Sequence, residues 1–372
     1  MQVAMLPQYA EPGQGSLLCL HRGGGCLYSD AMRPFTIGAI PSLEFGEGVF
    51  SDFLISLAVG ERGHLVVVTG GHSFRASKHW RELRVSAGSW RKVSEFSVAG
   101  EPSPGLVDGA VAGLRADPPD LVVAIGGGSA IDAGKAIAAM VCADGSVHDF
   151  LEGVGEREPS GETIPVIAIP TTSGTGSEAT KNAVISHVGT NGYKKSLRHD
   201  NYVPSKVYID PELTIGCPLE VTRYAGLDAI TQLLEAYVST GAGNVTDIYA
   251  IEGLRLAGLS FPALASGSDT VELRASMALA AYYSGIALAH AGLGIVHGLA
   301  SPLGAAYPAP HGAVCGTLLA EATATVIGAL EREAPLGENG VTASEGLSKY
   351  AKAGATLGGK DLGSPGANTR YL

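Results

Sequence analysis

Two histidines, a carboxylate and an amide in this chain have the chemistry to hold a divalent metal ion. Asp228 and Gln232 are four residues apart in a segment with helical spacing, so they should share one helix face. His297 and His311 lie in a stretch from Ala275 to Ala320 that contains no Asp, Glu, Lys or Arg. An isolated buried carboxylate is costly, and a divalent cation is one of the few partners that removes this cost. One carboxylate with two imidazoles suits Fe²⁺ or Zn²⁺ better than Mg²⁺ or Ca²⁺.

Each histidine also has a plainer interpretation. A single histidine in an apolar stretch is commonly a core imidazole that is bonded to a backbone carbonyl. His290 precedes His297 by seven residues, on about the same helix face, and this position favours a structural or supporting role. It is the combination of His297 and His311 with Asp228 that favours a metal site.

A glycine turn between an apolar strand and a helix has the chemistry to bind phosphate. The predicted strand Leu121–Ile125 runs into a turn and then a helical stretch over Ala130–Met140 with Asp132 near its start; the turn consists of Gly126, Gly127, Gly128 and Ser129. Backbone N–H groups in such a turn can approach a phosphate closely, and the positive end of the helix dipole adds attraction. The dinucleotide fingerprint G-x-G-x-x-G is not matched, because Ile131 stands where its third glycine would fall. A purely structural turn therefore stays open as an alternative.

A second loop strengthens the nucleotide hypothesis. The segment Thr171–Glu178 (TTSGTGSE) is rich in glycine and hydroxyl groups, and it follows the predicted strand Ile164–Ile169. Two such loops at the carboxyl ends of parallel strands predict one shared ligand crevice.

The elements that must position these residues change in character along the chain. The first part alternates strands with helices, which predicts a mainly parallel sheet; a further strand is expected over His64–Thr69 and a helix over Val107–Ala116. After Pro218 the spacing is helical, with helices expected over Val221–Ser239, Thr246–Ala257, Val271–Ala289 and Gly312–Leu330. We therefore expect a loose extension over residues 1–30, a dinucleotide-binding α/β domain over 31–216 and a helical metal-binding domain over 217–372.

Composition and charge exclude several classes of function. The net charge of −11 without clustered Lys and Arg argues against nucleic-acid binding. The stretch without charged residues is interrupted by glycines and prolines and lacks flanking aromatic and basic belts, so we expect a buried core and no membrane segment. Five scattered cysteines and no signal-peptide pattern over the first thirty residues predict reduced thiols and a cytoplasmic location.

Several longer motifs resemble one enzyme family. GGGSAIDAGK, IPTTSGTGSEAT, GLDAITQLLEAYVS and AGLGIVHGLASPLGAAYPAPHG occur in the order seen in the iron-containing (group III, metal-dependent) alcohol dehydrogenase family. The resemblance implies an α/β N-terminal Rossmann-like domain and an all-α C-terminal domain, the architecture of dehydroquinate synthase. It also implies NAD(H) or NADP(H), Fe²⁺ or Zn²⁺ as the metal, and a homo-oligomer.

The resemblance assigns roles to particular residues. It implies that Asp228, His297 and His311 bind the metal and are catalytic, with Gln232 nearby or bound. It places Gly127, Gly128 and Ser129 at the pyrophosphate. Further cofactor-binding residues, from the resemblance or from the loops themselves, are Gly126, Asp132, Thr171, Thr172, Ser173, Thr180 and Lys195.

The chain also departs from the family's pattern. Gln232 stands where the family usually has a metal-binding histidine, and Ser301 stands where many relatives have a histidine that can titrate. Gly70 occupies a position at which NAD-preferring relatives often carry an acidic residue, so NADPH use is also expected to be possible. The family normally continues through more helices after the Pro-His-Gly loop, and Ser364–Leu372 has the composition of a loop, so we expect a C-terminus that is truncated.

The predicted function is a metal-dependent NAD(P) alcohol dehydrogenase or aldehyde reductase that acts on a small alcohol or aldehyde, with no nucleic-acid or membrane partner. One alternative is a metal-independent reductase of the same superfamily that resembles maleylacetate reductase. Another is a catalytically inactive binding or assembly subunit, given Gln232 and Ser301. A lyase resembling dehydroquinate synthase matches the motifs less well.

Overall fold

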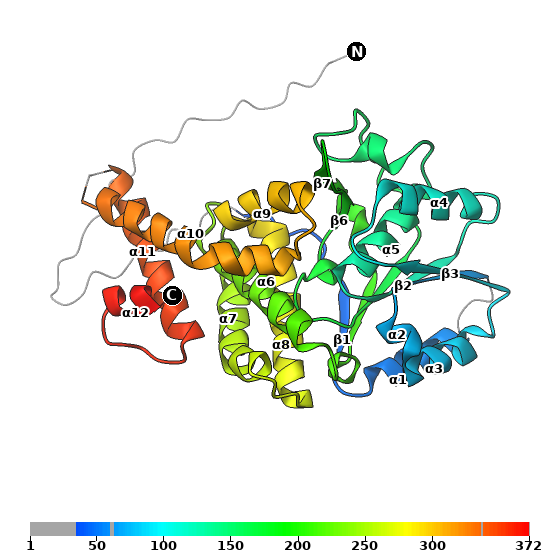
Figure 1. Ribbon diagram of the computed structural model, residues 1–372, viewed down its shortest axis with the longest axis horizontal. Coiled ribbons are helices and arrows are strands. Elements are labelled where there is room, and N and C mark those ends of the chain that lie inside the picture. The colour runs from blue at the N-terminus through cyan, green and yellow to red at the C-terminus, as the bar shows by residue number, and fades with distance from the viewer. Residues whose placement is uncertain (1–34, 60–62, 336–337, 372) are drawn as a thin grey trace, which may run out of the picture. The chain divides into compact units, whose positions relative to one another are not determined.

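A computed structural model describes residues 35–59, 63–335 and 338–371 of the chain, so the extension expected over 1–30 lies outside the described residues. A parallel sheet with flanking helices comes first and a helical part follows (Figure 1), which confirms the predicted fold class. The last strand of the sheet ends at Ile209 and the first helix of the helical part begins at Leu219.

The main sheet has six strands, and every pairing in it is parallel. Their spatial order is β1-β8-β5-β4-β2-β3. The bounds are β1 Ser42–Phe45, β2 His64–Gly70, β3 Lys92–Val98, β4 Leu121–Gly126, β5 Val166–Pro170 and β8 Lys206–Ile209. The register sets Gly126 opposite Pro170, so the loops that follow β4 and β5 begin side by side.

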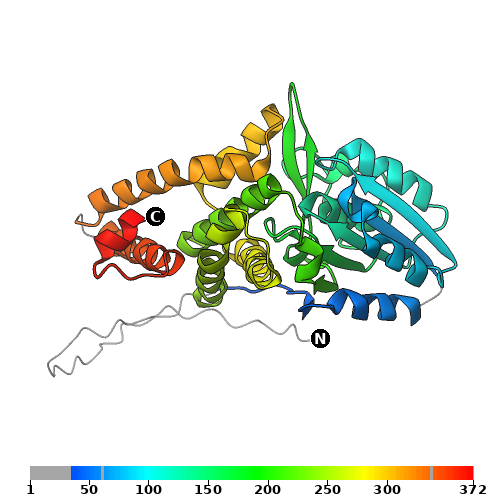
Figure 2. The same ribbon diagram turned by 60° about the horizontal axis from the view of Figure 1, so that its bottom comes forward.

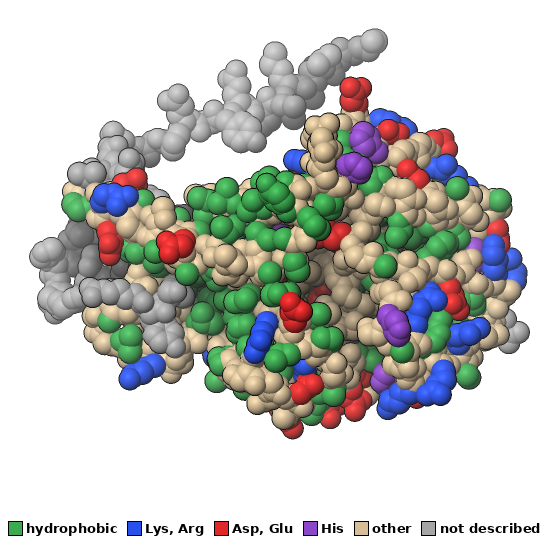
Figure 3. Space-filling model, in the orientation of Figure 1, with side chains coloured by type: hydrophobic (Ala, Val, Ile, Leu, Met, Phe, Trp, Pro, Cys, Tyr) green, Lys and Arg blue, Asp and Glu red, His purple; other side chains and the backbone are tan. Residues whose placement is uncertain are grey.

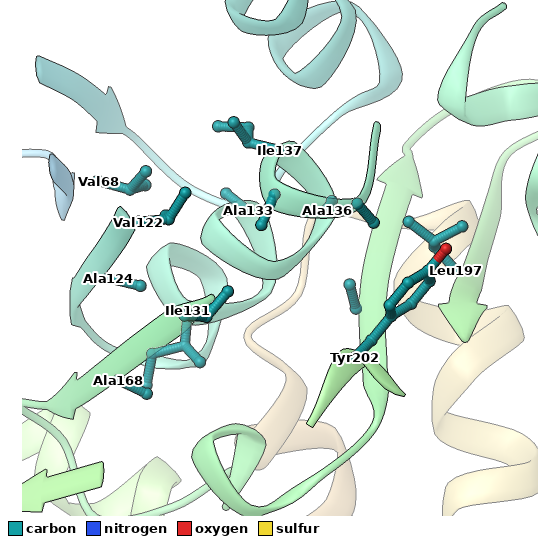
Figure 4. Close-up of a cluster of buried hydrophobic side chains, with 14 of the residues drawn as sticks. Val68, Val122, Ala124, Ile131, Ala133, Ala136, Ile137, Ala168, Leu197 and Tyr202 are labelled. Atoms are coloured by element: carbon teal, nitrogen blue, oxygen red, sulfur yellow. The ribbon is translucent and has the colours of Figure 1, made fainter. Parts of the chain in front are cut away.

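The central strands are mostly apolar because helices cover both faces of the sheet. Leu65 and Val67 of β2 pack in one hydrophobic cluster with α1 (Val49–Val59) and α3 (Lys78–Ala87), next to which lies the short α2 (Ser73–Ala76). Val66 and Val68 point the other way and pack with α4 (Pro104–Leu114) and α5 (Gly128–Met140). Figure 4 shows Ile131, Ala133 and Ile137 of α5 beside Val68 and the neighbouring strand residues Val122 and Ala124.

A two-stranded antiparallel hairpin, β6 (Asn182–His187) and β7 (Tyr193–Arg198), was not predicted from the sequence. Its strands lie outside the main sheet, and α5 packs against β6. The tip of the hairpin contacts α9, where the Gly189 N–H donates to the carbonyl of Ala305 at 3.1 Å (Figure 2).

The helical part contains α6 (Leu219–Val238), α7 (Asn244–Ala265), α8 (Val271–Ala291), α9 (Ile295–Ala306), α10 (His311–Glu333), α11 (Glu338–Leu357) and α12 (Pro365–Tyr371). The helices predicted over this region are present, and most extend beyond the predicted ends. Helices α6, α7 and α8 share a hydrophobic core that includes Leu233, Leu254 and Ala280.

Helices α9 and α10 leave much apolar surface uncovered. Ile295, Leu299 and Leu303 of α9 are 49%, 45% and 39% exposed, and hydrophobic side chains gather over both helices in Figure 3. By length and composition alone, α7 and α10 would each be able to cross a membrane.

The prediction that Ser364–Leu372 forms a loop was wrong, because α12 occupies Pro365–Tyr371. The Ser364 hydroxyl accepts from the N–H of Ala367 at 3.3 Å, as an N-terminal helix cap does. Pro365 starts the helix, where its fixed φ is favourable and its missing N–H costs nothing. The proline and glycine that indicated a loop are therefore in the first turn of a helix.

At one point the loop after β5 and α8 approach each other backbone to backbone. Gly176 has φ +59, and a Cβ added to it would lie 2.5 Å from the Cα of Gly285. A Cβ added to Gly285 would in turn collide with the carbonyl oxygen of Gly176. No side chain can be accommodated between these two glycines.

Candidate metal and cofactor site

Four side chains capable of binding a metal converge in the helical part. The Oδ1 atom of Asp228 lies 3.5 Å from Nε2 of His297 and 3.7 Å from Nε2 of His311. The Sγ atom of Cys315 lies 3.9 Å and 3.7 Å from the same two nitrogens. One ligand atom from each of the four residues falls within 4.8 Å of the others. The structure thus brings together the predicted trio and adds a thiol that the sequence analysis did not single out.

These side chains come from three helices that meet at one point. Asp228 is on the buried face of α6, His297 is in the first turn of α9, and His311 is the first residue of α10. Cys315 follows His311 by four residues, so it lies one turn along the same face of α10.

A buried carboxylate on α6 holds the first turn of α9 in place. Glu235 accepts hydrogen bonds from the N–H of Val296 at 2.6 Å and the N–H of His297 at 3.3 Å. Its Oε2 atom also lies 2.6 Å from Nδ1 of His297. This contact leaves Nε2 of His297 free to face Asp228 and is the arrangement by which metal-binding histidines are commonly oriented. Glu235 was missed from the sequence, although its position seven residues after Asp228 puts it on the same helix face.

The donor atoms fit a divalent cation. Asp228 is 2% exposed, and its Oδ1 atom has no hydrogen-bond partner among the described residues; the same holds for Nδ1 of His311. Burial opposes the ionised form of Asp228, but His297 and His311 outweigh it and lower the pKa of the carboxyl. Burial likewise opposes protonation of His297, yet Asp228, Cys315 and Glu235 raise its pKa to about 12. The carboxylates therefore favour positive charge at His297, whereas burial lowers the pKa of His311 and favours its neutral form.

Gln232 does not direct its oxygen toward this cluster. Its Nε2 donates to Oδ2 of Asp228 at 3.1 Å, and its Oε1 accepts from the hydroxyl of Ser284 at 2.7 Å. The amide thus fixes one carboxylate oxygen of Asp228 and leaves the other, Oδ1, facing the two histidines. In this arrangement Gln232 lies next to the cluster and positions Asp228, and its oxygen is bonded to Ser284.

The glycine turn after β4 approaches its neighbours too closely for a side chain. Helix α5 begins at this turn, with Gly127 as its N-cap. A Cβ on Gly128 would lie 2.5 Å from Oγ1 of Thr175 in the second loop, and the N–H of Thr171 donates to the carbonyl of Gly126 at 2.9 Å. The two predicted loops are therefore adjacent, at the positive end of the α5 dipole.

A single cavity of about 420 Å³ joins the two parts of the site. On one side it is lined by Gly128 and Ser129 of the glycine turn, and on the other by Asp228, His297 and His311. Gln232 and Ser301 also contribute, as do the predicted cofactor residues Asp132 and Thr180.

Other predicted cofactor residues lie elsewhere. Thr171 and Thr172 line a second cavity of about 490 Å³, next to Lys78 and the start of α2. Ser173 is buried with an unpartnered hydroxyl. Lys195 is exposed on β7 and does not line the 420 Å³ cavity, whereas its neighbour Lys194 does. Because successive side chains of a strand point to opposite faces, only one of these two neighbouring lysines can face the cavity.

A buried ionic network fixes α5 against the second loop. The Lys135 ammonium pairs with Asp132 at 3.0 Å, and it donates to the carbonyl of Ser177 at 2.8 Å and the hydroxyl of Thr180 at 3.2 Å. Burial lowers the pKa of Lys135 and raises that of nearby Glu178 to about 7. This network lies directly behind the cofactor side of the cavity.

Comparisons with known proteins identify both parts of the chain. Residues 41–211 match the family described as "Iron-containing alcohol dehydrogenase", and residues 222–359 match "Fe-containing alcohol dehydrogenase family, C-terminal". The chain is 34% identical over 293 residues to alcohol dehydrogenase 4 of Saccharomyces cerevisiae, covering 75% of this chain and 72% of the relative. It is 42% identical to long-chain-alcohol dehydrogenase 1 of Geobacillus thermodenitrificans, over 59% of this chain and 55% of that protein.

A solved structure supports the same assignment. The structure of a 1,3-propanediol oxidoreductase superposes with a TM-score of 0.73 at 26% identity, and the match covers 91% of this chain and 84% of the other. The matches to the first curated bacterial relatives span little more than half of those proteins, 51% to 55% of their length.

Proposed function

The chain belongs to the iron-containing alcohol dehydrogenase family, and on that premise we propose that it transfers hydride between a nicotinamide cofactor and a small alcohol or aldehyde. The observation that carries this proposal is that one cavity is lined both by the glycine turn of α5 and by Asp228, His297 and His311. The cofactor phosphates and a cation could thus be held on opposite sides of one substrate.

The residues of the chain have separate tasks in this reaction. Asp228, His297 and His311 would hold the divalent cation, and the N-terminus of α5 would hold the cofactor pyrophosphate. When bound, the cation supplies Lewis-acid polarisation of the carbonyl, and the nicotinamide supplies or accepts the hydride.

Other residues shape the environment of the reaction. Leu288 and Leu293 add apolar wall to the cavity, which excludes water and strengthens electrostatic interactions inside it. Ser301 lines the cavity one helical turn after His297, where its hydroxyl can relay a proton to water.

Both nicotinamide cofactors fit the proposal. β2 ends at Gly70, a residue without a carboxylate that would repel a 2′-phosphate, and among the described residues nothing lies within 4 Å of a Cβ built on it. Lys78 lines the adjoining cavity and offers a positive charge near this end of the site.

The proposal is tested with purified protein, a panel of small alcohols and aldehydes, and both cofactors. We expect turnover in at least one pair, loss of turnover after exhaustive chelation, and recovery on adding back Fe²⁺ or Zn²⁺. Asp228→Asn should lose both metal and turnover, whereas Glu321→Gln, an exposed carboxylate on α10, is the matched control that should keep both.

The outcomes separate the alternatives. Turnover that survives removal of all metal would identify a metal-independent reductase. Bound cofactor without turnover in any pair would identify a binding or assembly subunit and refute the proposal.

A homo-oligomer in the cytoplasm stays part of the proposal. The uncovered apolar face of α9 supports self-association, since large exposed apolar patches are typical of contact surfaces. Light scattering on the eluting protein would measure the oligomeric state.

A further inference from the structure

We propose that Cys315 is the fourth protein ligand of the cation site and makes this site selective for Zn²⁺ over Fe²⁺. The inference rests on the proposed function, because it requires that Asp228, His297 and His311 bind a divalent cation. It goes beyond that function by assigning a ligand and a metal preference.

The positions of the ligand atoms support four-coordination. In a tetrahedral zinc site with ordinary bond lengths, neighbouring ligand atoms are about 3.4 to 3.6 Å apart. The Sγ atom of Cys315 lies 3.9 Å and 3.7 Å from Nε2 of His297 and His311, and Oδ1 of Asp228 lies 3.5 Å and 3.7 Å from the same nitrogens. These separations are within a few tenths of an ångström of such a site.

A buried cysteine is often only a small apolar side chain. Cys315 is fully buried and does pack with Val296 and Ala300. Its sulfur, however, lies next to the nitrogens of both histidines that face Asp228. A second observation also points to a ligand, because Oδ1 of Asp228 is buried, faces the same space and accepts no hydrogen bond from the described residues.

The fourth position is available to Cys315 because Gln232 does not take it. The amide oxygen of Gln232 accepts a hydrogen bond from Ser284, and its nitrogen donates to Asp228. The fourth ligand would therefore be the Cys315 thiol on α10, and not the Gln232 amide on α6.

A sulfur ligand changes the preferred metal. Thiolate is a soft ligand that selects zinc, whereas carboxylate and imidazole alone discriminate less. A metal-bound thiol loses its proton, so one carboxylate and one thiolate would balance the charge of a divalent cation. Four protein ligands do not close the site to substrate, since catalytic zinc can expand to five-coordination.

The direct test uses the unmodified protein loaded with zinc. X-ray absorption at the zinc edge should detect one sulfur at about 2.3 Å, together with nitrogen and oxygen neighbours. A zinc-loaded protein without a sulfur neighbour would overturn the inference. This measurement does not depend on whether any variant folds.

Cobalt and a pair of variants provide the second test. Chelator-stripped protein reloaded with Co²⁺ should show thiolate-to-cobalt absorption in the near ultraviolet, and Cys315→Ser should lose it. The serine variant should also bind Zn²⁺ more weakly. Mutation of residues that only orient metal ligands typically costs about 10- to 100-fold in affinity, and loss of a ligand should cost at least as much. The affinity of the serine variant for Fe²⁺ should change less. Cys142→Ser, at a half-buried thiol on another element, should leave spectrum and affinities unchanged.

The results distinguish the two proposals. Metal-dependent turnover with no sulfur signal and an unchanged zinc affinity in Cys315→Ser would refute only the role of Cys315. A wild-type protein that binds neither zinc, iron nor cobalt would refute the metal site itself, and with it both proposals.

Discussion

Replacing Glu178 with glutamine should remove a pH dependence of folding that the wild-type chain carries. Glu178, the last residue of the second glycine-rich loop, is 3% exposed. Burial raises its pKa from 4.5 to about 7, although its own backbone and Lys135 partly oppose the shift. The folded state therefore binds a proton more tightly than the unfolded state does.

The sign and size follow from this difference. The stabilising effect of the bound proton is complete below about pH 4.5 and is lost as the pH rises through about 7. The shift, 7 minus 4.5, is about 2.5 units, and at 1.36 kcal/mol per unit it amounts to about 3 kcal/mol. Because the group is buried, solvent screening does not reduce this value. Glutamine has a similar shape and cannot ionise.

We therefore expect the free energy of unfolding of Glu178→Gln to exceed that of wild type by about 3 kcal/mol at pH 8.5. Near pH 5 this difference should shrink to about 1 kcal/mol or less. Urea unfolding of both proteins at the same salt and metal content gives this difference, in which any metal contribution cancels. Glu321→Gln controls for the loss of one carboxylate. A Glu178→Gln difference that stays constant from pH 5 to pH 8.5 would show that burial does not hold Glu178 in its neutral form.

Three further changes probe the site. Glu235→Gln should weaken metal binding by about 10- to 100-fold, because a neutral amide orients His297 less firmly; competition with a chromogenic chelator measures this, and an unchanged affinity would contradict it. In Gly128→Ala the added Cβ would meet Thr175 and displace the glycine turn. The Kd of NADH or NADPH should rise by about tenfold or more, which corresponds to the loss of one charge-assisted hydrogen bond. Fluorescence titration measures this Kd. Lys194→Ala should reduce kcat/KM by about tenfold, because Lys194 lines the cavity. A larger loss of kcat/KM in Lys195→Ala would favour Lys195 as the cofactor-binding lysine, as the sequence analysis expected.

The sequence was sufficient for the parts that depend on local spacing. The apolar runs in β2 and β4 predict buried parallel strands. The glycine turn between β4 and α5 is likewise visible in the sequence, because it directly follows such a run. Asp228, His297 and His311 were also identified, since few carboxylates and histidines lie in so apolar a region.

What the sequence did not reveal depends on how separate elements are aligned. Cys315 reaches the cluster only because α10 begins at His311 and turns that face toward α6. Which of Lys194 and Lys195 faces the cavity depends on the phase of β7, and the orientation of the Gln232 amide depends on Ser284 of α8. None of these relationships is a local property of a sequence segment.

The contact between Gly176 and Gly285 limits how this site can be changed by mutation. The cofactor loop and the helical part meet there without a side chain, and glycine is already the smallest residue. A larger residue at one position therefore has no compensating change at the other. Redesign for a longer or bulkier substrate has to work through wall residues such as Leu288, Leu293 and Ser301. Under the proposed function, this contact sets the spacing between the glycine turn and the cation cluster, whereas the wall residues set the width of the cavity.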